Sequence, residues 1–361
     1  MSYSLGLDAS VNGYTFDYVN CFEKPLGIIL ANDEQHLQSW LWIYLKMLQC
    51  YRLEYSVGSD VFYTIDFNSA LLRILGQKLG YVMEHQKVQP DQLNDIVKKH
   101  IHSGHPALVP GNLRELPNSS YYGSGDWKHI FLIHGYDDER QLYTVTDTDH
   151  QPTGPVLHYK ERQMAYELVD ELFRSAGEHL HTSWVWSIHQ PEDYVPPDEK
   201  ELLLEALHWL IHRRSSQPYT ELEYIERINC GKNAADACSE YISDEAGDVS
   251  EADDPVSKVD FMFLRSVKYK ELLYRELHTV LKRCELSHES LEQLEQRRTQ
   301  LCRLWSAIAN QALVSHYLQQ AVRLTEEMNT VLKEEEEMIQ LLIHIEQEVR
   351  KVPSPQRAVQ S

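Results

Sequence analysis

The strongest constraint on the fold is a change in hydrophobic spacing along the chain of 361 residues. From Lys258 to Arg350, apolar residues recur at helical spacing almost without interruption, which predicts an all-helical region. Residues 1–190 instead mix helix-like segments with short runs of β-branched and aromatic residues. The pattern therefore predicts an α+β domain, built from helices and an antiparallel sheet, followed by an all-α C-terminal region.

Turn-rich connections in residues 1–190 favour strands that pair with their sequence neighbours. The segment from Gly135 to Arg140 is of this kind, so residues 129–134 and 141–147 are expected to form a hairpin. Helices are expected at 21–30, 36–50, 69–79, 91–101 and 159–175, and strands at 61–67, 80–84, 106–109, 129–134, 141–147 and 182–188.

Composition divides the rest of the chain into three parts. Residues 191–238 are expected to form a helical connection, with amphipathic helices at 200–213 and 234–242. Residues 239–257 are rich in Asp, Glu, Ser and Gly, which predicts a flexible acidic linker. Residues 258–361 are expected to form a helical C-terminal domain.

Two features of the C-terminal region lead to further expectations. The run Glu334–Glu337 is expected on a solvated helix face. Apolar residues from Leu301 to Val349 keep helical spacing, which is typical of a platform for the first domain or of an arm that forms a homodimer.

Charge and cysteine content exclude several classes of protein. Asp and Glu number 55 against 34 Lys and Arg, a net charge of −21, which argues against binding to nucleic acid or to an anionic membrane. No apolar run is long enough to span a bilayer, and no signal peptide is visible. The six cysteines include no Cys-x-x-Cys pair. We therefore expect a reduced, cytoplasmic protein.

The most specific candidate catalytic group is Cys21, His129 and Asp147. Cys21 follows a loop and opens a predicted helix, where the partial positive charge of the helix N-terminus favours a thiolate. His129 begins one predicted strand and Asp147 ends the next, so antiparallel pairing should bring them together at one end of the hairpin. A carboxylate that orients an imidazole beside a thiol is the arrangement that a nucleophilic cysteine needs.

Two neighbouring residues are alternatives for these roles. His134 lies five residues after His129, an odd offset that turns the two side chains to opposite faces of a strand. Asp149 would share a face with Asp147 if the strand continued that far.

Residues 118–125 are rich in Ser, Gly and Tyr, and we expect them to form a lid near His129. Tyr121 and Tyr122 are therefore candidate substrate-binding residues. Histidines also cluster elsewhere, but spacing fixes no Cys or carboxylate partner for them, so we expect no metal site. These histidines are His100, His102, His105, His179 and His181. No Gly-rich phosphate loop or dinucleotide fingerprint is present, and we expect no bound cofactor.

The order of Cys, then His on a strand, then Asp on the neighbouring strand resembles the papain-like cysteine fold. Four segments also resemble the N-terminal domain of the butirosin biosynthesis protein H family. They are Asn20 to Glu23, Gly104 to Val109, His129 to Asp138 and Tyr143 to Asp147. Later pieces, residues 231–242 and 260–275, are similar to the helical region that follows this domain, so the resemblance spans about residues 15–280.

The resemblance implies acyl transfer through a cysteine thioester, in natural-product biosynthesis of the nonribosomal-peptide type. Cys21 would take the acyl group from the phosphopantetheine arm of a carrier protein, His129 would act as base and then acid, and Asp147 would orient the imidazole. The acceptor would be a small-molecule amine. The backbone N–H of Cys21 and the side chain of Asn20 are the implied oxyanion donors. Asn112 stands where relatives tend to carry Asp, which makes it a further substrate-binding candidate.

Two other functions fit the same residues. A cysteine peptidase, or a thioester hydrolase or cyclase, would use water or an internal nucleophile in place of the amine. A carrier-binding scaffold without chemistry would keep the fold and show no preferred cysteine among the six.

Overall fold

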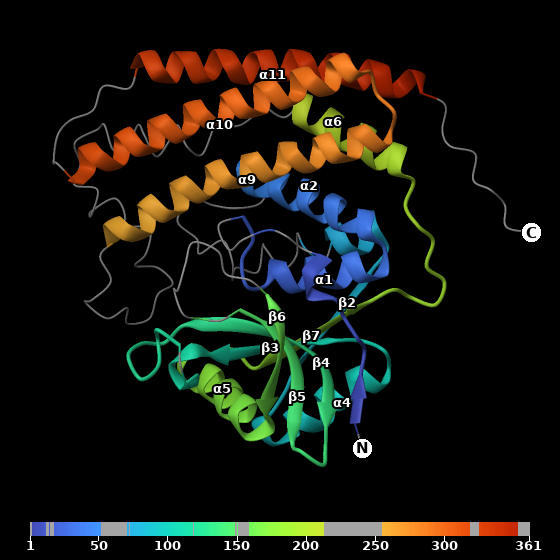
Figure 1. The fold of residues 1–361 in the computed structure, drawn as a ribbon, viewed down its shortest axis with the longest axis vertical. Helices are drawn as coiled ribbons and strands as arrows, with labels where there is room; N and C mark the ends of the chain where they lie inside the picture. The colour runs from blue at the N-terminus through green and yellow to red at the C-terminus, as the bar shows by residue number, and fades with distance from the viewer. Residues whose placement is uncertain are drawn as a thin grey trace, which may run out of the picture. The chain divides into compact units, whose positions relative to one another are not determined.

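The computed structural model has the α+β architecture with N-terminal helices, an antiparallel sheet and an all-helical C-terminal region (Figure 1). The chain divides into two compact units, Met1–Gln38 with Leu75–Pro196 and Ser39–Ile74 with Pro197–Ser361. The division falls inside one helix, and each unit is described by itself. The structure describes residues 2–11, 14, 18–51, 71, 73–117, 119–148, 150, 159–212, 255–317 and 325–352.

The first unit is built around a seven-stranded sheet, and the strands pair antiparallel throughout the described residues. The strand order is β2-β7-β3-β4-β5-β6, and β1 pairs with the C-terminal end of β4. The strands are β1 (Ser2–Ser4), β2 (Val82–Lys87), β3 (Ala107–Asn112), β4 (Lys128–Asp137), β5 (Leu142–Asp147), β6 (Lys160–Ala165) and β7 (Trp184–His189).

Helices of the first unit bury one face of this sheet. Helices α4 (Leu93–His102) and α5 (Tyr166–His179) form one apolar cluster with β3, β4 and β5. Helix α1 (Glu23–Asp33) is almost wholly buried, and Phe22 just before it meets Trp186 of β7 edge-on at 5.3 Å. Single turns complete the unit: η1 (Ala9–Val11), η2 (Ile74–Lys78), η3 (Pro90–Gln92) and η4 (Leu113–Glu115).

The second unit consists of helices. Helix α10 packs against α9 and α11, and α6 packs against α11. Their bounds are α6 (Glu199–His212), α9 (Pro255–Arg283), α10 (His288–Tyr317) and α11 (Thr325–Lys351), and α2 (Gln35–Tyr51) contributes its greater part to this unit. Within the described residues, no helix combines the length and the apolar character needed to cross a membrane.

The glutamate run of α11 corrects one prediction. Glu335 is buried, and its Oε1 accepts hydrogen bonds from Lys270 Nζ of α9 at 2.8 Å and from Trp305 Nε1 of α10 at 3.0 Å. Arg297 binds Glu334 at 2.9 Å and Glu337 at 2.7 Å. The expectation of a fully solvated face was wrong, because these glutamates hold three helices together.

Two further predictions need correction in the first unit, and one strand was not predicted. Residues 160–165 of the predicted helix 159–175 form β6, because pairing with β5 outweighs their helical propensity. The segment Gly135–Asp137, predicted as a turn, continues β4, and the turn follows at residues 138–141. The sequence also gave no sign of β1.

Other expectations lie partly or wholly outside the described residues. These are the strand at 61–67, the helix at 234–242 and all but the last three residues of the linker 239–257. Helix α9 already begins at Pro255.

Candidate active site

The hairpin of β4 and β5 contains a β-bulge. The register breaks between Ile133 and Gly135, so His134 is an extra residue in β4. An extra residue shifts the pairing of every β4 residue before it by one position. Because side chains alternate between the two faces of a sheet, a shift of one position changes which residues share a face across the pair. The bulge therefore decides which β4 residues share a face with Asp147.

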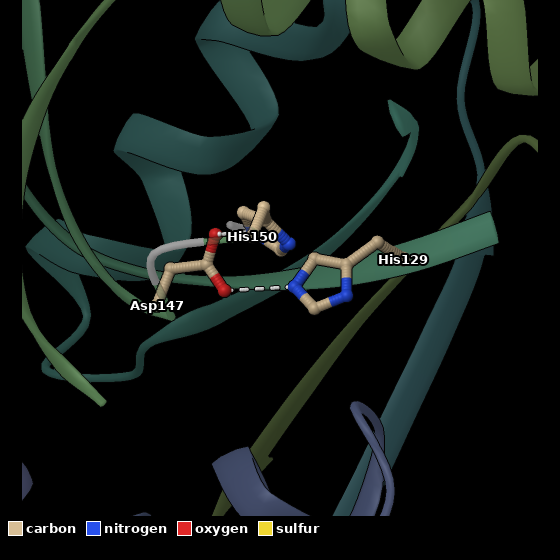
Figure 2. A group of neighbouring side chains, drawn as sticks. All are labelled: His129, Asp147 and His150. Atoms are coloured by element: carbon tan, nitrogen blue, oxygen red, sulfur yellow. Dashed lines mark hydrogen bonds and ion pairs between the residues drawn. The ribbon is translucent and has the colours of Figure 1, made fainter. Parts of the chain in front are cut away.

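His129 and Asp147 lie on one face because of this bulge. On the N-terminal side of the bulge, Leu132 of β4 pairs with Thr146 of β5. The same register places Asp147 opposite Phe131, which is two residues from His129 and on the same face. The two residues are thus diagonal neighbours, not direct partners. Without the bulge, Asp147 would oppose Leu132 on the other face. In the structure His129 Nε2 lies 2.8 Å from Asp147 Oδ1, and both side chains are buried (Figure 2).

A reciprocal cap forms at the start of α1, the helix that follows Cys21. Asn20 Oδ1 accepts hydrogen bonds from the backbone N–H groups of Phe22 and Glu23, both at 2.8 Å. Glu23 Oε2 accepts one from the Asn20 N–H at 3.1 Å, which completes a capping box. The Asn20 carbonyl also accepts the N–H of Lys24 at 3.0 Å. Cys21 therefore lies in the capped turn that leads into α1, two residues before Glu23, where the helix dipole favours a thiolate.

The Cys21 thiol is a hydrogen-bonding neighbour of the His129 imidazole. Asp147 holds Nε2, so Nδ1 is the ring nitrogen left for the thiol. Burial acts to lower the pKa of His129, but the charges and hydrogen bonds of Asp147 and Cys21 outweigh it and raise that pKa to about 10. The attraction is mutual, so the imidazolium stabilises the thiolate.

Asp147 is the charged partner of this pair. Burial acts to raise its pKa, but the charges and hydrogen bonds of His129 and His150 hold it well below its usual range. At neutral pH, therefore, a buried carboxylate faces a buried imidazolium.

A second imidazole contacts the same carboxylate. His150 Nε2 lies 2.5 Å from Asp147 Oδ2, and its ring meets that of His129 at 87° with the ring centroids 4.4 Å apart (Figure 2). His150 was not among the residues predicted from the sequence. Asp149 was the predicted alternative, and it lies outside the described residues. The available signal was a histidine three positions after the carboxylate.

His129, Asp147 and His150 also form a group of three potential metal ligands, with ligand atoms within 4.8 Å of one another. Each imidazole is hydrogen-bonded to its own carboxylate oxygen, so the group is satisfied as it stands. Two of the histidines considered in the sequence have other contacts. His102 Nε2 is hydrogen-bonded to the hydroxyl of Tyr136, and His105 stacks on His189 with centroids 4.0 Å apart.

The alternative base, His134, faces away from this group. Its Nε2 lies 3.1 Å from Oγ1 of Thr146, the residue that precedes Asp147 and points to the opposite face of β5. Burial lowers the pKa of His134 to about 4, so this imidazole stays neutral at pH 7.

Asn112 is buried at the end of β3, and its side chain is fully engaged within the protein. Its Nδ2 donates to Asp126 Oδ1 at 2.7 Å and to Ser175 Oγ at 3.1 Å. Its Oδ1 accepts the backbone N–H groups of Arg114 at 3.2 Å and Trp127 at 3.0 Å. The structure thus places Asn112 as the anchor of the segment that follows β3.

That segment carries the two tyrosines proposed as substrate-binding residues. Tyr121 stacks on Trp127 with ring centroids 4.7 Å apart, and Tyr122 is 58% exposed. The backbone N–H of Ser120 donates to the carbonyl of His150 at 3.4 Å. The segment is therefore attached to the chain beside Asp147.

Two buried hydrogen-bond donors near Cys21 have no partner among the residues that the structure describes. They are Asn20 Nδ2 and the Tyr159 hydroxyl. Burial and the charges of Asp147 and Cys21 raise the pKa of Tyr159 well above its usual value, so the phenol keeps its proton. An unsatisfied buried donor costs about 1–3 kcal/mol. An oxyanion formed at Cys21 would satisfy such groups.

Lys24 adds a buried amine beside Tyr159. Its Nζ lies 5.3 Å from the centroid of the Tyr159 ring and donates to the carbonyl of Tyr14 at 2.5 Å. Burial lowers the pKa of Lys24 to about 7. Neither Lys24 nor Tyr159 was among the residues predicted from the sequence.

A comparison with models of known protein families finds no match, and a comparison with curated proteins finds no significant match either.

Proposed function

We propose that this protein is a cysteine-dependent acyltransferase that forms an acyl thioester on Cys21. The observation that carries the proposal is the buried chain of contacts from Cys21 through His129 to Asp147. It combines a thiol just before a helix, an imidazole with a raised pKa and a carboxylate that orients it. These are the parts that a nucleophilic cysteine requires.

The reaction would proceed in two steps. The Cys21 thiolate attacks the carbonyl carbon of a thioester donor, and the tetrahedral intermediate expels the donor thiolate, which takes the proton from His129. The acceptor amine then attacks the Cys21 thioester and gives its proton to His129. Collapse of the second intermediate forms the amide and releases the Cys21 thiolate, so the charge pair with His129 is restored.

The oxyanion of each intermediate would lie near the start of α1. The backbone N–H of Cys21 and the unpartnered Asn20 Nδ2 are two donors on the same turn. The Tyr159 hydroxyl is a third candidate, because it is buried, protonated and sensitive to the charge of Cys21.

The proposed donor is an acyl, aminoacyl or peptidyl group on the phosphopantetheine arm of a carrier protein, and the proposed acceptor is a small-molecule amine. Both follow from the resemblance to the butirosin biosynthesis protein H family, as does a place in natural-product biosynthesis. The papain-like arrangement is supported by a cysteine at a helix start facing a histidine on an antiparallel sheet. A cytoplasmic location is proposed because the six cysteines include no Cys-x-x-Cys pair. A homodimer through the C-terminal helices is proposed from their spacing alone.

The test is turnover with defined donors and acceptors. An acylated carrier protein and the matching N-acetylcysteamine thioester are each incubated with the protein, with and without a primary diamine, and products are identified by mass spectrometry. Cys21→Ala is the test variant and Cys50→Ala, which removes another buried thiol, is the matched control. An amide product that Cys21→Ala loses and Cys50→Ala keeps supports the proposal.

The other outcomes would overturn it. Free acid as the sole product, with or without amine, would make the protein a thioester hydrolase. No product and no difference between the two variants would favour a carrier-binding scaffold.

A further inference from the structure

We propose that His150 is a positioning residue, a second imidazole that holds Asp147 from the side opposite His129 and thereby sets the reactivity of Cys21. This inference rests on the proposed nucleophilic role of Cys21, but it concerns a residue that neither the sequence pattern nor the resemblance indicated.

The two imidazoles occupy different oxygens of one carboxylate. His129 Nε2 is 2.8 Å from Oδ1 of Asp147, and His150 Nε2 is 2.5 Å from Oδ2 (Figure 2). A carboxylate held at one oxygen can still turn about its Cβ–Cγ bond, whereas one held at both oxygens cannot. His150 therefore fixes the direction in which Oδ1 meets His129.

A neutral His150 satisfies every contact in this arrangement. A proton on Nε2 donates to Asp147, and Nδ1 is left as an acceptor 3.5 Å from the hydroxyl of Thr148. The charged groups that face His150 are His129, Asp147 and Arg162 of β6. Burial acts first to lower the pKa of His150, and the two cations act in the same direction. The proton of the pair is therefore carried by His129, and His150 acts as a fixed donor.

The backbone of His150 has an unusual conformation and makes a hydrogen bond of its own. Its φ of 51° lies in the left-handed region, which residues other than glycine rarely adopt. Its carbonyl accepts the N–H of Ser120 at 3.4 Å, so the segment that carries Tyr121 is tied to the same residue. Side chain and main chain together place His150 between Asp147 and that segment.

The experiment compares two substitutions of different chemistry. His150→Gln keeps an amide N–H that can donate to Asp147, and His150→Leu keeps bulk without a donor. His181 also has a φ of 51° but is exposed and is not one of the site residues, so His181→Leu controls for a branched residue in this backbone conformation. The readout is the rate of Cys21 alkylation by iodoacetamide from pH 5 to pH 10, measured by peptide mass spectrometry.

We expect His150→Leu to slow alkylation at pH 6 by roughly 10–100-fold, the range expected when a catalytic group loses its alignment. His150→Gln should recover most of the rate, and His181→Leu should match the wild type. With a thioester donor, kcat should fall in His150→Leu while KM stays the same. Circular dichroism of each variant limits the comparison to folded protein.

Three results would overturn the inference. His150→Leu could follow the wild-type pH profile, or His150→Gln could be as slow as His150→Leu, and either would show that the donated hydrogen bond does not matter. Stoichiometric zinc in the wild type that is lost in His150→Gln would make His150 a metal ligand instead. Alkylation needs no acyl donor, so the inference can fail or stand separately from the proposed acyl transfer.

Discussion

Replacing Asp147 by Asn tests the electrostatic core of the site. The substitution keeps the shape of the side chain and an oxygen that can accept from His129 Nε2, but it removes the negative charge. Burial acts to lower the pKa of His129, and without the charge of Asp147 much less opposes this effect. The pKa of His129 should therefore fall. The imidazole should be neutral at pH 7.5, and the Cys21 thiolate should lose its cation.

The size of the effect depends on how much of the Cys21 thiol remains ionised when His129 is neutral. An ordinary thiol with a pKa of about 8.5 is only about 0.3% ionised at pH 6. If Cys21 reverts to an ordinary thiol, its alkylation at pH 6 should fall by up to about 300-fold.

The same substitution should change stability in a pH-dependent way. Removing one partner of a buried pair costs about 3–5 kcal/mol. The raised pKa of His129 stabilises the fold fully below pH 6.5, and that contribution is lost as pH rises through about 10. The lowered pKa of Asp147 contributes above about 3.8 and is lost as pH falls below it. The difference in the free energy of unfolding between the wild type and Asp147→Asn should therefore be largest between about pH 4 and pH 6.5.

The assays are iodoacetamide labelling at pH 6 and urea unfolding at pH 5.5 and pH 9.5. Asp138→Asn is the matched control, because Asp138 pairs with Lys98 beyond the other end of the hairpin. Equal labelling of Cys21 in Asp147→Asn and the wild type at pH 6 would refute the reasoning, as would a stability difference that grows toward pH 9.5.

Three further predictions concern other parts of the chain. Asn20→Ala and Tyr159→Phe should each lower kcat for thioester turnover, by about 100-fold or more for a true oxyanion donor; unchanged kcat in either variant would remove that residue from the oxyanion site. His134→Gln should alkylate Cys21 at the wild-type rate from pH 6 to pH 8, because His134 faces away from the site, and a tenfold loss would reopen its role as base. Lys270→Met should destabilise the protein by about 3–5 kcal/mol in urea unfolding, because it leaves Glu335 buried without its cation; the double variant Lys270→Met/Glu335→Leu should recover much of this loss, and no recovery would contradict the pairing.

The sequence was informative where local patterns decide the structure. The helix that follows Cys21 and the hairpin of residues 129–134 and 141–147 were both predicted, because each depends on nearby residues. The meeting of His129 with Asp147 was expected from simple pairing, but the structure achieves it differently. A single bulged residue, which no pattern in the sequence marks, brings the two side chains to one face.

The features that the sequence did not reveal depend on distant partners. Residues 160–165 have helix-forming side chains, yet they pair with β5. Glu335 stands in a run of identical residues, and its burial follows from Lys270, 65 positions away. His150 gains its place from the left-handed turn of the chain after β5, which brings its ring back to Asp147. Such contacts are set by tertiary packing, and the hydrophobic periodicity of the sequence does not predict them.

The most direct test of the central claim is the mass of the intact protein after brief incubation with an acylated carrier protein and no acceptor amine. The wild type should gain one acyl group, which peptide mapping should locate on Cys21, and the adduct should disappear when an amine is added. Cys21→Ala should gain nothing, and Cys50→Ala should behave as the wild type. An adduct on another residue, or none under conditions where Cys21 is readily alkylated, would contradict acyl transfer through Cys21.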